Sequence, residues 1–416
     1  MAGDFLCTVI ESCTHTFHEG DAFMSKRLVF VSNYFNHHQK PLAEEFLKIY
    51  DQDYTFIAMT PFNQKRLAIG YSDMNDAPFV LRAYESPQAQ REAQTLINES
   101  DCVIVAGMPV NVVGERLAQG KLTFMQSERF FKGPLWKDAV RFVKYCRYSG
   151  GRSAAKSRSA KFYLLCASAF AAWDYNTCVL FRGKAYRWGY FPELKHYDDP
   201  KGLICRKDEH SILWVGRFLN WKHPDLAVKL AQNLKVQGKS FRVKIIGSGE
   251  MQEELARMID AMNLHDCVEL SGALPVERVR SEMERAEVFL FTSDRQEGWG
   301  VVLSEAMNSG CAVAAGEKIG SAPYLVRHGE NGLIFKDRSI DDLTEKVSIL
   351  LDEPEKVRSL GLNAYESMVN VWSPAMAAKR FVELSVALRE NEGAVSLWDD
   401  GPCSAAPVII RPSDSW

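Results

Sequence analysis

The sequence has no hydrophobic run long enough to cross a membrane, no paired cysteines and only a small net charge. The longest mostly apolar run, residues 164–173, falls short of the roughly 18 residues that a membrane-spanning helix needs. The ten cysteines include no Cys-x-x-Cys pair, so we expect reduced thiols in a cytosolic protein, with neither a disulfide framework nor a zinc site. A net charge of −3 over 416 residues gives no reason to expect a nucleic-acid-binding protein.

The first 25 residues lack a targeting pattern. They have no positively charged start and no apolar core, so a signal peptide is not expected, and we interpret residues 1–25 as an N-terminal extension. Four potential metal ligands occur in it: Cys7, Cys13, His15 and His18. An irregular extension is the far commoner explanation for such residues, so no metal site is predicted.

From Lys26 onward, strand patterns alternate with helical patterns. Apolar runs predict strands at residues 28–31, 55–59, 102–106, 122–125 and 163–167. Helices are predicted from Pro41 and at residues 88–98, 111–118, 135–148 and 169–176. This alternation implies an α/β fold in which right-handed crossovers build a parallel sheet that helices cover on both faces. Ligands of such sheets bind outside the carboxyl ends of the strands.

The second half repeats the alternation after an aromatic, turn-rich segment, residues 186–200. Strands are predicted at residues 212–215, 243–246, 268–270, 288–291 and 311–315, and helices from Asp341, Pro354 and Pro374. We therefore expect two domains, residues 26–205 and 206–373, followed by a helix at residues 374–391. Residues 392–416 contain Gly, Pro and Ser with little periodicity, and they are predicted to form a loose tail.

One stretch of the second half joins a predicted strand to a predicted helix through glycines. It consists of Glu297, Gly298, Trp299, Gly300 and Val301, with Glu305 about one turn later. Such a turn leaves backbone N–H groups pointing out of the helix start, where the macrodipole favours a phosphate. The two glutamates flank this anion site, and a nucleotide sugar, with hydroxyls on both sides of its phosphates, fits that order. The alternative is a solvated loop glutamate and a helix-surface glutamate beside an ordinary turn.

Two cations follow an earlier predicted strand. Arg217 comes directly after Gly216, and Lys222 stands five residues later, just before Pro224 opens a helix. Arg binds two oxygens with its planar fork and Lys acts as a point charge, so the pair suits a diphosphate, although alone it is weak evidence. Residues 247–249, Gly-Ser-Gly, form another strand-to-helix turn, without the third glycine of the dinucleotide fingerprint.

Loops of the first half occupy the equivalent edge of its sheet. His37 and His38 follow the first strand and could donate to a sugar or exchange a proton near neutrality, while a purely local hydrogen-bonding role is an equal alternative. Glu128 and Arg129 follow the strand at residues 122–125 and could reach the ligand, but a surface ion pair explains them slightly better.

Residues 132–161 carry a local excess of positive charge, and the part from Leu135 to Lys161 is the candidate membrane-binding segment. Residues 132–161 contain nine Lys or Arg residues against one acid, Asp138. Within the predicted helix, Lys137, Arg141 and Lys144 recur beside apolar residues, which makes the helix basic and amphipathic. Such a helix can lie on an anionic membrane surface, and the open alternative is a solvated face over a core stripe.

The second half resembles the nucleotide-binding domain of the family-four retaining glycosyltransferases, bacterial polysaccharide type, whose two Rossmann-like domains face a cleft (the GT-B fold). Five features carry the resemblance: Gly216-Arg217 with Lys222, residues 247–249, residues 272–275, Glu297 with Glu305, and residues 319–335. It covers residues 208–370 strongly and residues 26–200 by architecture alone. One departure is that His37-His38-Gln39 stands where many members have a Gly-Gly pair, which leaves open how this loop approaches the donor phosphate.

The resemblance implies a role for each residue at the donor site. Glu297 would contact the transferred sugar, Glu305 the ribose hydroxyls, and Arg217 and Lys222 the diphosphate. The base would meet the backbone of Leu274. From the sequence pattern itself we also predict His38 as a catalytic residue of the first loop, and Gly247, Gly298, Trp299, Gly300 and Val301 as donor-binding residues. The helix at residues 374–391 would pack back on the first domain.

We therefore expect a cytoplasmic, metal-independent enzyme without a cofactor. It would move a hexose from a nucleoside diphosphate sugar to a hydroxyl of a saccharide or lipid-linked acceptor, with retention, in cell-surface polysaccharide or glycolipid synthesis. A peripheral location at the inner face of the plasma membrane depends on the basic helix, and no nucleic-acid partner is expected. The alternatives are a sugar-nucleotide epimerase and a non-catalytic binding subunit of the same architecture.

Overall fold

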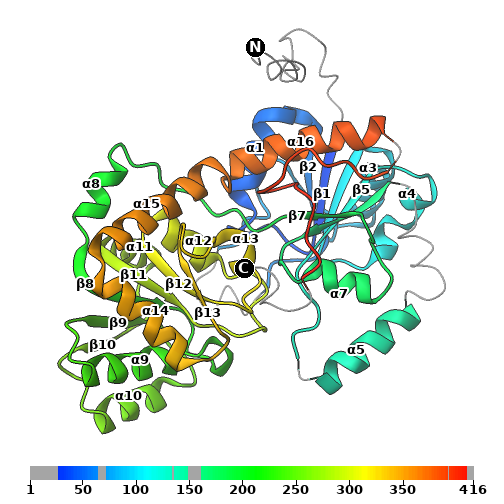
Figure 1. Cartoon of the computed structure of the whole chain (residues 1–416). Coiled ribbons are helices and arrows are strands. Elements are labelled where there is room, and N and C mark those ends of the chain that lie inside the picture. The colour runs from blue at the N-terminus through cyan, green and yellow to red at the C-terminus, as the bar shows by residue number, and fades with distance from the viewer. Residues whose placement is uncertain (1–26, 64–71, 134, 149–160, 392, 410–416) are drawn as a thin grey trace, which may run out of the picture.

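The chain folds into two α/β domains in the computed structural model, which describes residues 27–63, 72–133, 135–148, 161–391 and 393–409 (Figure 1). The first domain contains a seven-stranded parallel sheet in the order β3-β2-β1-β4-β5-β6-β7. Its strands are β1 (Leu28–Ser32), β2 (Tyr54–Ala58), β3 (Val80–Arg82), β4 (Cys102–Ala106), β5 (Thr123–Ser127), β6 (Phe162–Cys166) and β7 (Ala185–Arg187). The expected parallel α/β fold is confirmed.

The helices of this domain follow the predicted alternation with one difference. They are α1 (Lys40–Tyr50), α3 (Pro87–Glu99), α4 (Gly114–Ala118), α5 (Leu135–Tyr148) and α7 (Ala171–Thr177). The helix predicted at residues 111–118 is instead a 3₁₀ turn, Val110–Val113, followed by α4. Three of the four residues in that turn are valines, whose branched side chains disfavour a continuous α-helix.

The second domain contains a six-stranded parallel sheet in the order β10-β9-β8-β11-β12-β13. Its strands are β8 (Asp208–Val215), β9 (Arg242–Ile246), β10 (Val268–Gly272), β11 (Ala286–Phe291), β12 (Ala312–Gly316) and β13 (Leu333–Phe335). Its helices are α8 (Pro200–Cys205), α9 (Asp225–Val236), α10 (Gln252–Ala261), α11 (Val276–Arg285), α12 (Val301–Asn308), α13 (Ala322–Leu325), α14 (Ile340–Asp352) and α15 (Pro354–Asn370). None of the described helices is both long and apolar enough to cross a bilayer.

The boundary between the domains lies slightly earlier than the sequence predicts. Helix α8, which the sequence pattern assigns to the first domain, packs on α15 of the second. Ile204 of α8 is buried close to Gly310, which directly precedes the β12 region. Burial of this apolar side chain therefore attaches residues 200–205 to the second domain.

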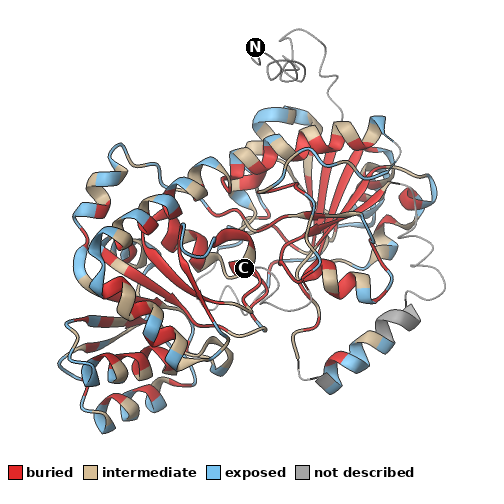
Figure 2. Ribbon diagram, in the orientation of Figure 1, coloured by how far each residue is buried: buried red, intermediate tan, exposed pale blue. Residues whose placement is uncertain are grey.

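The last helix, α16 (Pro374–Glu390), returns to the first domain as expected and packs on α1 (Figure 1). The Phe381 ring lies 5.5 Å from Phe46 of α1 and 4.9 Å from Phe124 of β5. One buried core is continuous from the first sheet to the second, and buried residues line both sheets (Figure 2). Trp188, Trp299 and Trp372 belong to this core. The two domains therefore share apolar packing close to the Glu297 loop.

The prediction of a loose tail is wrong for residues 393–409. Ala405 forms an antiparallel bridge with Tyr186 of β7, and the Cys403 amide donates to the Arg187 carbonyl at 2.8 Å. Cys403 is fully buried. The edge of β7 offers unpaired backbone groups, and pairing with them orders a segment whose own composition favours no regular structure. Residues 410–416 lie outside the described residues.

Candidate functional site

The carboxyl ends of β8, β9 and β10 bring two glycine loops into direct contact. Gly247 donates its amide to the Gly272 carbonyl at 2.8 Å. It has a φ of 149°, and a Cβ there would overlap the Gly216 carbonyl oxygen. A Cβ at Gly249 would likewise press on the backbone of Phe218. The close packing of these loops therefore requires glycine at both positions. A contact between Gly247 and the sugar donor stays a prediction.

Lys222 and Glu297 meet at this edge. Lys222 Nζ lies 2.6 Å from Glu297 Oε2, and both side chains are largely buried, with exposed fractions of 13% and 11%. The Ser293 hydroxyl donates to the same carboxylate oxygen at 3.0 Å. The structure therefore brings together two of the predicted site residues, from β8 and β11 loops that are 75 residues apart. Ser293 was not predicted from the sequence, although it stands on the same loop as Glu297.

A hydrogen-bonded support holds the backbone of Lys222. Thr292, at the end of β11, donates its hydroxyl toward the carbonyls of Lys222 and His223, at 2.8 and 2.9 Å. Trp214 of β8 donates its indole N–H to that hydroxyl at 2.8 Å. These buried groups fix the chain that carries the Lys222 ammonium.

His223 adds charge to this support. It has a left-handed backbone, with a φ of 48°, and its ring nitrogens lie 3.6 Å from Asp225 and 3.5 Å from Asp294. Burial alone would lower the pKa of His223, but the hydrogen bonds and charges of the two aspartates outweigh it and raise the pKa to about 9. His223 therefore carries a positive charge at neutral pH directly behind Lys222.

Helix α12 begins with a row of backbone donors. The amides of residues 298–302 donate no hydrogen bond to any described residue. The first amide of this stretch that does donate is that of Leu303, which bonds to the Gly300 carbonyl. Gly300 has a φ of 85°, and a Cβ on it would overlap the buried Phe291 ring. This arrangement suits an anion, because the free donors and the helix dipole point the same way.

Trp299 contributes to this helix start with its backbone. Its side chain is only 2% exposed, with ring centroids 6.3 Å from Tyr324 and 6.1 Å from Trp372. Its carbonyl accepts a hydrogen bond from Ser321. The indole therefore belongs to the shared core, and any contact of Trp299 with a donor would use the amide. A donor contact by Val301 stays a prediction.

Glu305 lies in the second turn of α12 and keeps an unpaired carboxylate. No described residue gives it a hydrogen bond or an ion pair through the side chain, while Arg280 contacts its backbone carbonyl at 3.4 Å. Burial raises the pKa of the Glu305 carboxyl above its usual range, and the charge of Arg280 offsets part of this. A half-buried acid without donors is a binding candidate, because a ligand hydroxyl would relieve its desolvation.

Arg217 and Leu274 occupy neighbouring loops of the same edge. Arg217 is exposed, and its guanidinium makes no hydrogen bond or ion pair with any described residue. Leu274 is half-buried against the shared core, in the loop between β10 and α11. Both remain accessible to a ligand, and their contacts with a donor stay predictions.

Residues of the first domain contact the Glu297 loop of the second domain. Glu128 and Lys132 form an ion pair, and a Cβ at Gly298 would overlap the Glu128 carboxylate. The Ala169 amide donates to the Gly320 carbonyl across the domains at 2.8 Å. Gly320, whose amide also donates to the Glu297 carbonyl at 3.2 Å, is a second positioning residue that sequence reasoning missed.

Arg129 has a structural role in the first domain. Its guanidinium is largely buried, 3.7 Å from the Asp174 carboxylate and 4.6 Å from the Phe170 ring centroid. Burial raises the pKa of Asp174 to about 6, with Arg129 and two backbone amides opposing that rise. Arg129 therefore forms a buried ion pair with Asp174, not the surface pair expected from the sequence, whereas the partly exposed Glu128 pairs with Lys132 beside the Glu297 loop.

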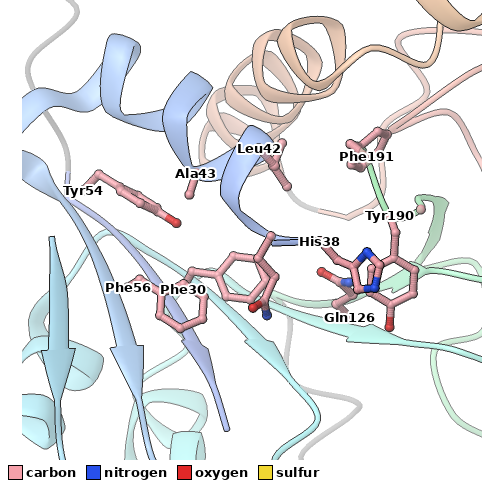
Figure 3. Close-up of a pocket in the computed structure, with 11 residues that line it drawn as sticks. Phe30, His38, Leu42, Ala43, Tyr54, Phe56, Gln126, Tyr190 and Phe191 are labelled. Atoms are coloured by element: carbon pink, nitrogen blue, oxygen red, sulfur yellow. The ribbon is translucent and has the colours of Figure 1, made fainter. Parts of the chain in front are cut away.

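His38 lies at the carboxyl end of the first sheet, beside a small cavity (Figure 3). Its ring centroid is 6.5 Å from Tyr190, and Gln126 lines the same cavity. None of the residues lining this cavity comes from the second sheet. No described contact links His38 to the lining of the second domain's sheet edge through this cavity, and a catalytic role of His38 stays a prediction.

Metal ligands do not cluster in the part of the chain that the structure describes. It holds no group of three or more His, Cys, Asp or Glu side chains placed to bind a metal ion. The four Cys and His residues of the N-terminal extension lie outside the described residues.

Residues 198–367 match the family model described as glycosyl transferases group 1. This segment is a glycosyl transferases group 1 domain. It contains every predicted donor-site residue from Arg217 to Glu305. The first domain, which carries His38, lies outside the matched segment.

Curated relatives match the same half of the chain. An exopolysaccharide phosphotransferase of Streptomyces coelicolor is 28% identical over 178 residues, which is 43% of this chain and 19% of that protein. An amylovoran biosynthesis glycosyltransferase of Erwinia amylovora is 35% identical over 126 residues, 29% of this chain and 31% of that protein. The chain therefore spans less than half the length of either relative.

Solved structures match nearly the whole chain. HepE of Anabaena, in complex with UDP, has a TM-score of 0.62 at 12% identity and covers 87% of this chain and 100% of its own. A glycosyltransferase of Rickettsia africae has the same TM-score and identity and covers 89% of this chain. This likeness shows the two-domain GT-B fold.

Proposed function

We propose that the protein moves a hexose from a nucleoside diphosphate sugar to a hydroxyl of a saccharide or lipid-linked acceptor, with retention at the anomeric carbon. The observation that carries this proposal is the order of groups along one sheet edge. Glu297 comes first, the free amides of residues 298–302 follow, and the unpaired Glu305 ends the row. A sugar, a diphosphate and a ribose fit that order.

Stabilisation of the leaving diphosphate would supply most of the catalysis. Arg217 and Lys222 would bring two positive charges to it, and the amides at the start of α12 would donate to its oxygens. Glu297 would orient the transferred hexose rather than attack it, and the acceptor hydroxyl would approach on the face that the phosphate leaves. With these cations in place, we propose that the reaction needs neither a metal ion nor a cofactor.

The acceptor class is proposed from two sources. The named relatives include proteins of exopolysaccharide and amylovoran synthesis, which supports a saccharide or a lipid-linked saccharide. The basic α5 of the first domain supports an acceptor presented at the inner face of the plasma membrane. His38, at the carboxyl edge of the same domain, would then face the acceptor side.

Nucleotide binding is the first experiment. Because a ligand that binds only the folded protein raises its melting temperature, UDP, GDP, ADP and their hexose conjugates are each added to the protein and to its Glu305→Gln variant. We expect one nucleoside diphosphate to raise the melting temperature of the wild type, and less so in the variant. No shift with any nucleotide would contradict the proposal.

Product analysis then separates the alternatives. Proton NMR of the product anomeric centre should show the configuration of the donor. An epimerase would change the free sugar nucleotide without consuming an acceptor. A binding subunit would bind the nucleotide and form no product.

A further inference from the structure

The outward side of helix α5 exposes large apolar side chains. Trp136, Val140 and Val143 are 66%, 61% and 52% exposed, and their spacing of four and three residues places them on one face of the helix. Figures 1 and 2 show α5 at the periphery of the first domain, with exposed surface along it. Three such residues side by side differ from the single exposed apolar residues that most surfaces carry.

Positive charge accompanies this apolar face. Lys137 Nζ lies 5.2 Å from the centroid of the Trp136 ring. The Arg141 side chain is 51% exposed, and its guanidinium lies 3.5 Å from the Asp138 carboxylate and donates to the Phe130 carbonyl at 3.1 Å. We call these five residues the α5 outer face: Trp136, Lys137, Val140, Arg141 and Val143.

The only acid of α5 points inward. Asp138 is 7% exposed and accepts hydrogen bonds from the Gly133 amide at 3.0 Å and from Arg295 at 2.7 Å. Arg295 belongs to the second domain, two residues before Glu297, and also donates to the Phe131 carbonyl at 2.8 Å. Asp138 shares its charge between Arg295 and Arg141, so among the described residues Lys137 carries the unshared positive charge of the outer face. The inward acid also fixes which side of the helix faces away from the protein.

We propose that the α5 outer face docks on an anionic lipid bilayer, with Trp136, Val140 and Val143 among the acyl chains and Lys137 and Arg141 at the headgroups. An aromatic and aliphatic stripe flanked by cations matches the layered polarity of a bilayer interface. A second copy of this chain is a poorer partner, because pairing the faces would bring their cations together. The inference deepens the proposed function, on which it rests, by naming the surface on which the acceptor lies.

The link through Arg295 gives this docking a direction. Asp138 joins the lipid-facing helix to the loop that carries Glu297. A protein docked through α5 therefore holds its Glu297 loop beside the membrane, where a lipid-linked acceptor would be presented.

Vesicle sedimentation tests the surface. The full chain is mixed with phosphatidylcholine vesicles, with and without phosphatidylglycerol, at low and high salt. We expect binding only to the anionic vesicles and release by salt, because screening shortens the reach of the cations. A wild-type protein that stays in the supernatant under all conditions overturns the proposal.

Variants separate the apolar and the cationic parts. Trp136→Ala with Val140→Ser and Val143→Ser should weaken partition at least tenfold, and so should Lys137→Gln with Arg141→Gln. Val236→Ser, which changes an 83% exposed valine on α9, is the matched control and should partition as the wild type does. Equal partition of all four proteins overturns the assignment to α5.

Depth and partner are tested on the same samples. Bromine-labelled lipid should quench part of the tryptophan fluorescence of the wild type, and this part should be missing in Trp136→Phe. A concentration-dependent dimer that Trp136→Ala disperses would assign the face to a second copy and overturn the proposal. Nucleotide-induced melting shifts are recorded in parallel, so that a failure of lipid binding with intact nucleotide binding rejects this inference alone.

Discussion

Lys222 and Arg217 carry the same charge but differ in what surrounds them. Lys222 is largely buried and paired with Glu297, whereas Arg217 is exposed and has no partner among the described residues. Either cation would bind the leaving diphosphate with a charged hydrogen bond worth about 1.5–3 kcal/mol. Their removal should therefore affect catalysis similarly and stability differently.

We expect Arg217→Ala to lower transfer roughly ten- to hundredfold with an unchanged urea midpoint. Lys222→Ala should lower transfer as much and also destabilise the fold by about 1–3 kcal/mol, because it leaves the Glu297 carboxylate buried without its cation. Turnover assays and urea unfolding of both variants measure this difference. Equal stability of the two variants would show that the ion pair contributes nothing, and normal turnover would remove both residues from the donor site.

Glu305 should make stability depend on pH. Its folded pKa is raised by burial, so the folded chain holds this proton more tightly than the unfolded chain does. The resulting stability is fully present below the usual value of 4.5 and is lost as the pH rises through the raised folded pKa.

Glu305→Gln removes that titration. We expect the variant to melt above the wild type at pH 7–8, about as stable as the wild type near pH 4, and to bind nucleoside diphosphate more weakly at both. Melting curves across this pH range, with and without nucleotide, check both statements. If the difference between the proteins were independent of pH, the Glu305 carboxyl would not be the titrating group.

Among the secondary-structure elements, some strands are predictable from the sequence and others are not. Parallel strands end at one edge of a sheet, so the rule that ligands lie there is enough to place the Arg217, Gly247 and Glu297 loops together from the sequence alone. The strands β3 and β7 were not predicted, since each has three residues and no alternation, and each exists only by pairing with a neighbouring strand. Register and pairing are tertiary information that a short run does not carry.

The glycine before α12 has two functions, and a matched variant separates them. Gly300 has a φ of 85° and faces the Phe291 ring, whereas Gly329 has a φ of 82° and open space around it. We expect Gly329→Ala to cost about 1 kcal/mol, the strain of a left-handed alanine. Gly300→Ala should cost about 3 kcal/mol, because it adds overpacking against a buried ring.

Urea unfolding of the two alanine variants measures these costs. The melting shift caused by the nucleoside diphosphate that binds the wild type measures the anion site. Gly300→Ala should also lose the nucleotide shift, since it displaces the amides at the helix start, while Gly329→Ala should keep it. Similar losses of stability in the two variants would mean that the Phe291 contact does not constrain Gly300.

At the scale of the whole molecule, the C-terminal segment joins the domains. Asp400 forms ion pairs with Arg187 of β7 in the first domain and with Arg327 of the second, the latter at 2.8 Å. Its backbone carbonyl accepts from Arg380 of α16. The composition of this segment gave no sign of such order, because its stability comes from partners far away in the sequence.

Neutralising Asp400 should therefore loosen this junction. Asp400→Asn removes the charge that both arginines share, and we expect a loss of about 1 kcal/mol, near the upper end for partly exposed ion pairs. Its neighbour Asp399 is exposed and has no partner among the described residues, so Asp399→Asn is a control of equal net charge. Hydrogen exchange localises the effect to the Arg187 and Cys403 amides, which form hydrogen bonds between β7 and the tail. Both amides should exchange faster in Asp400→Asn and at the wild-type rate in Asp399→Asn. If both variants exchanged as the wild type does, backbone pairing alone would hold the tail, and the three charges would play no part in joining the domains.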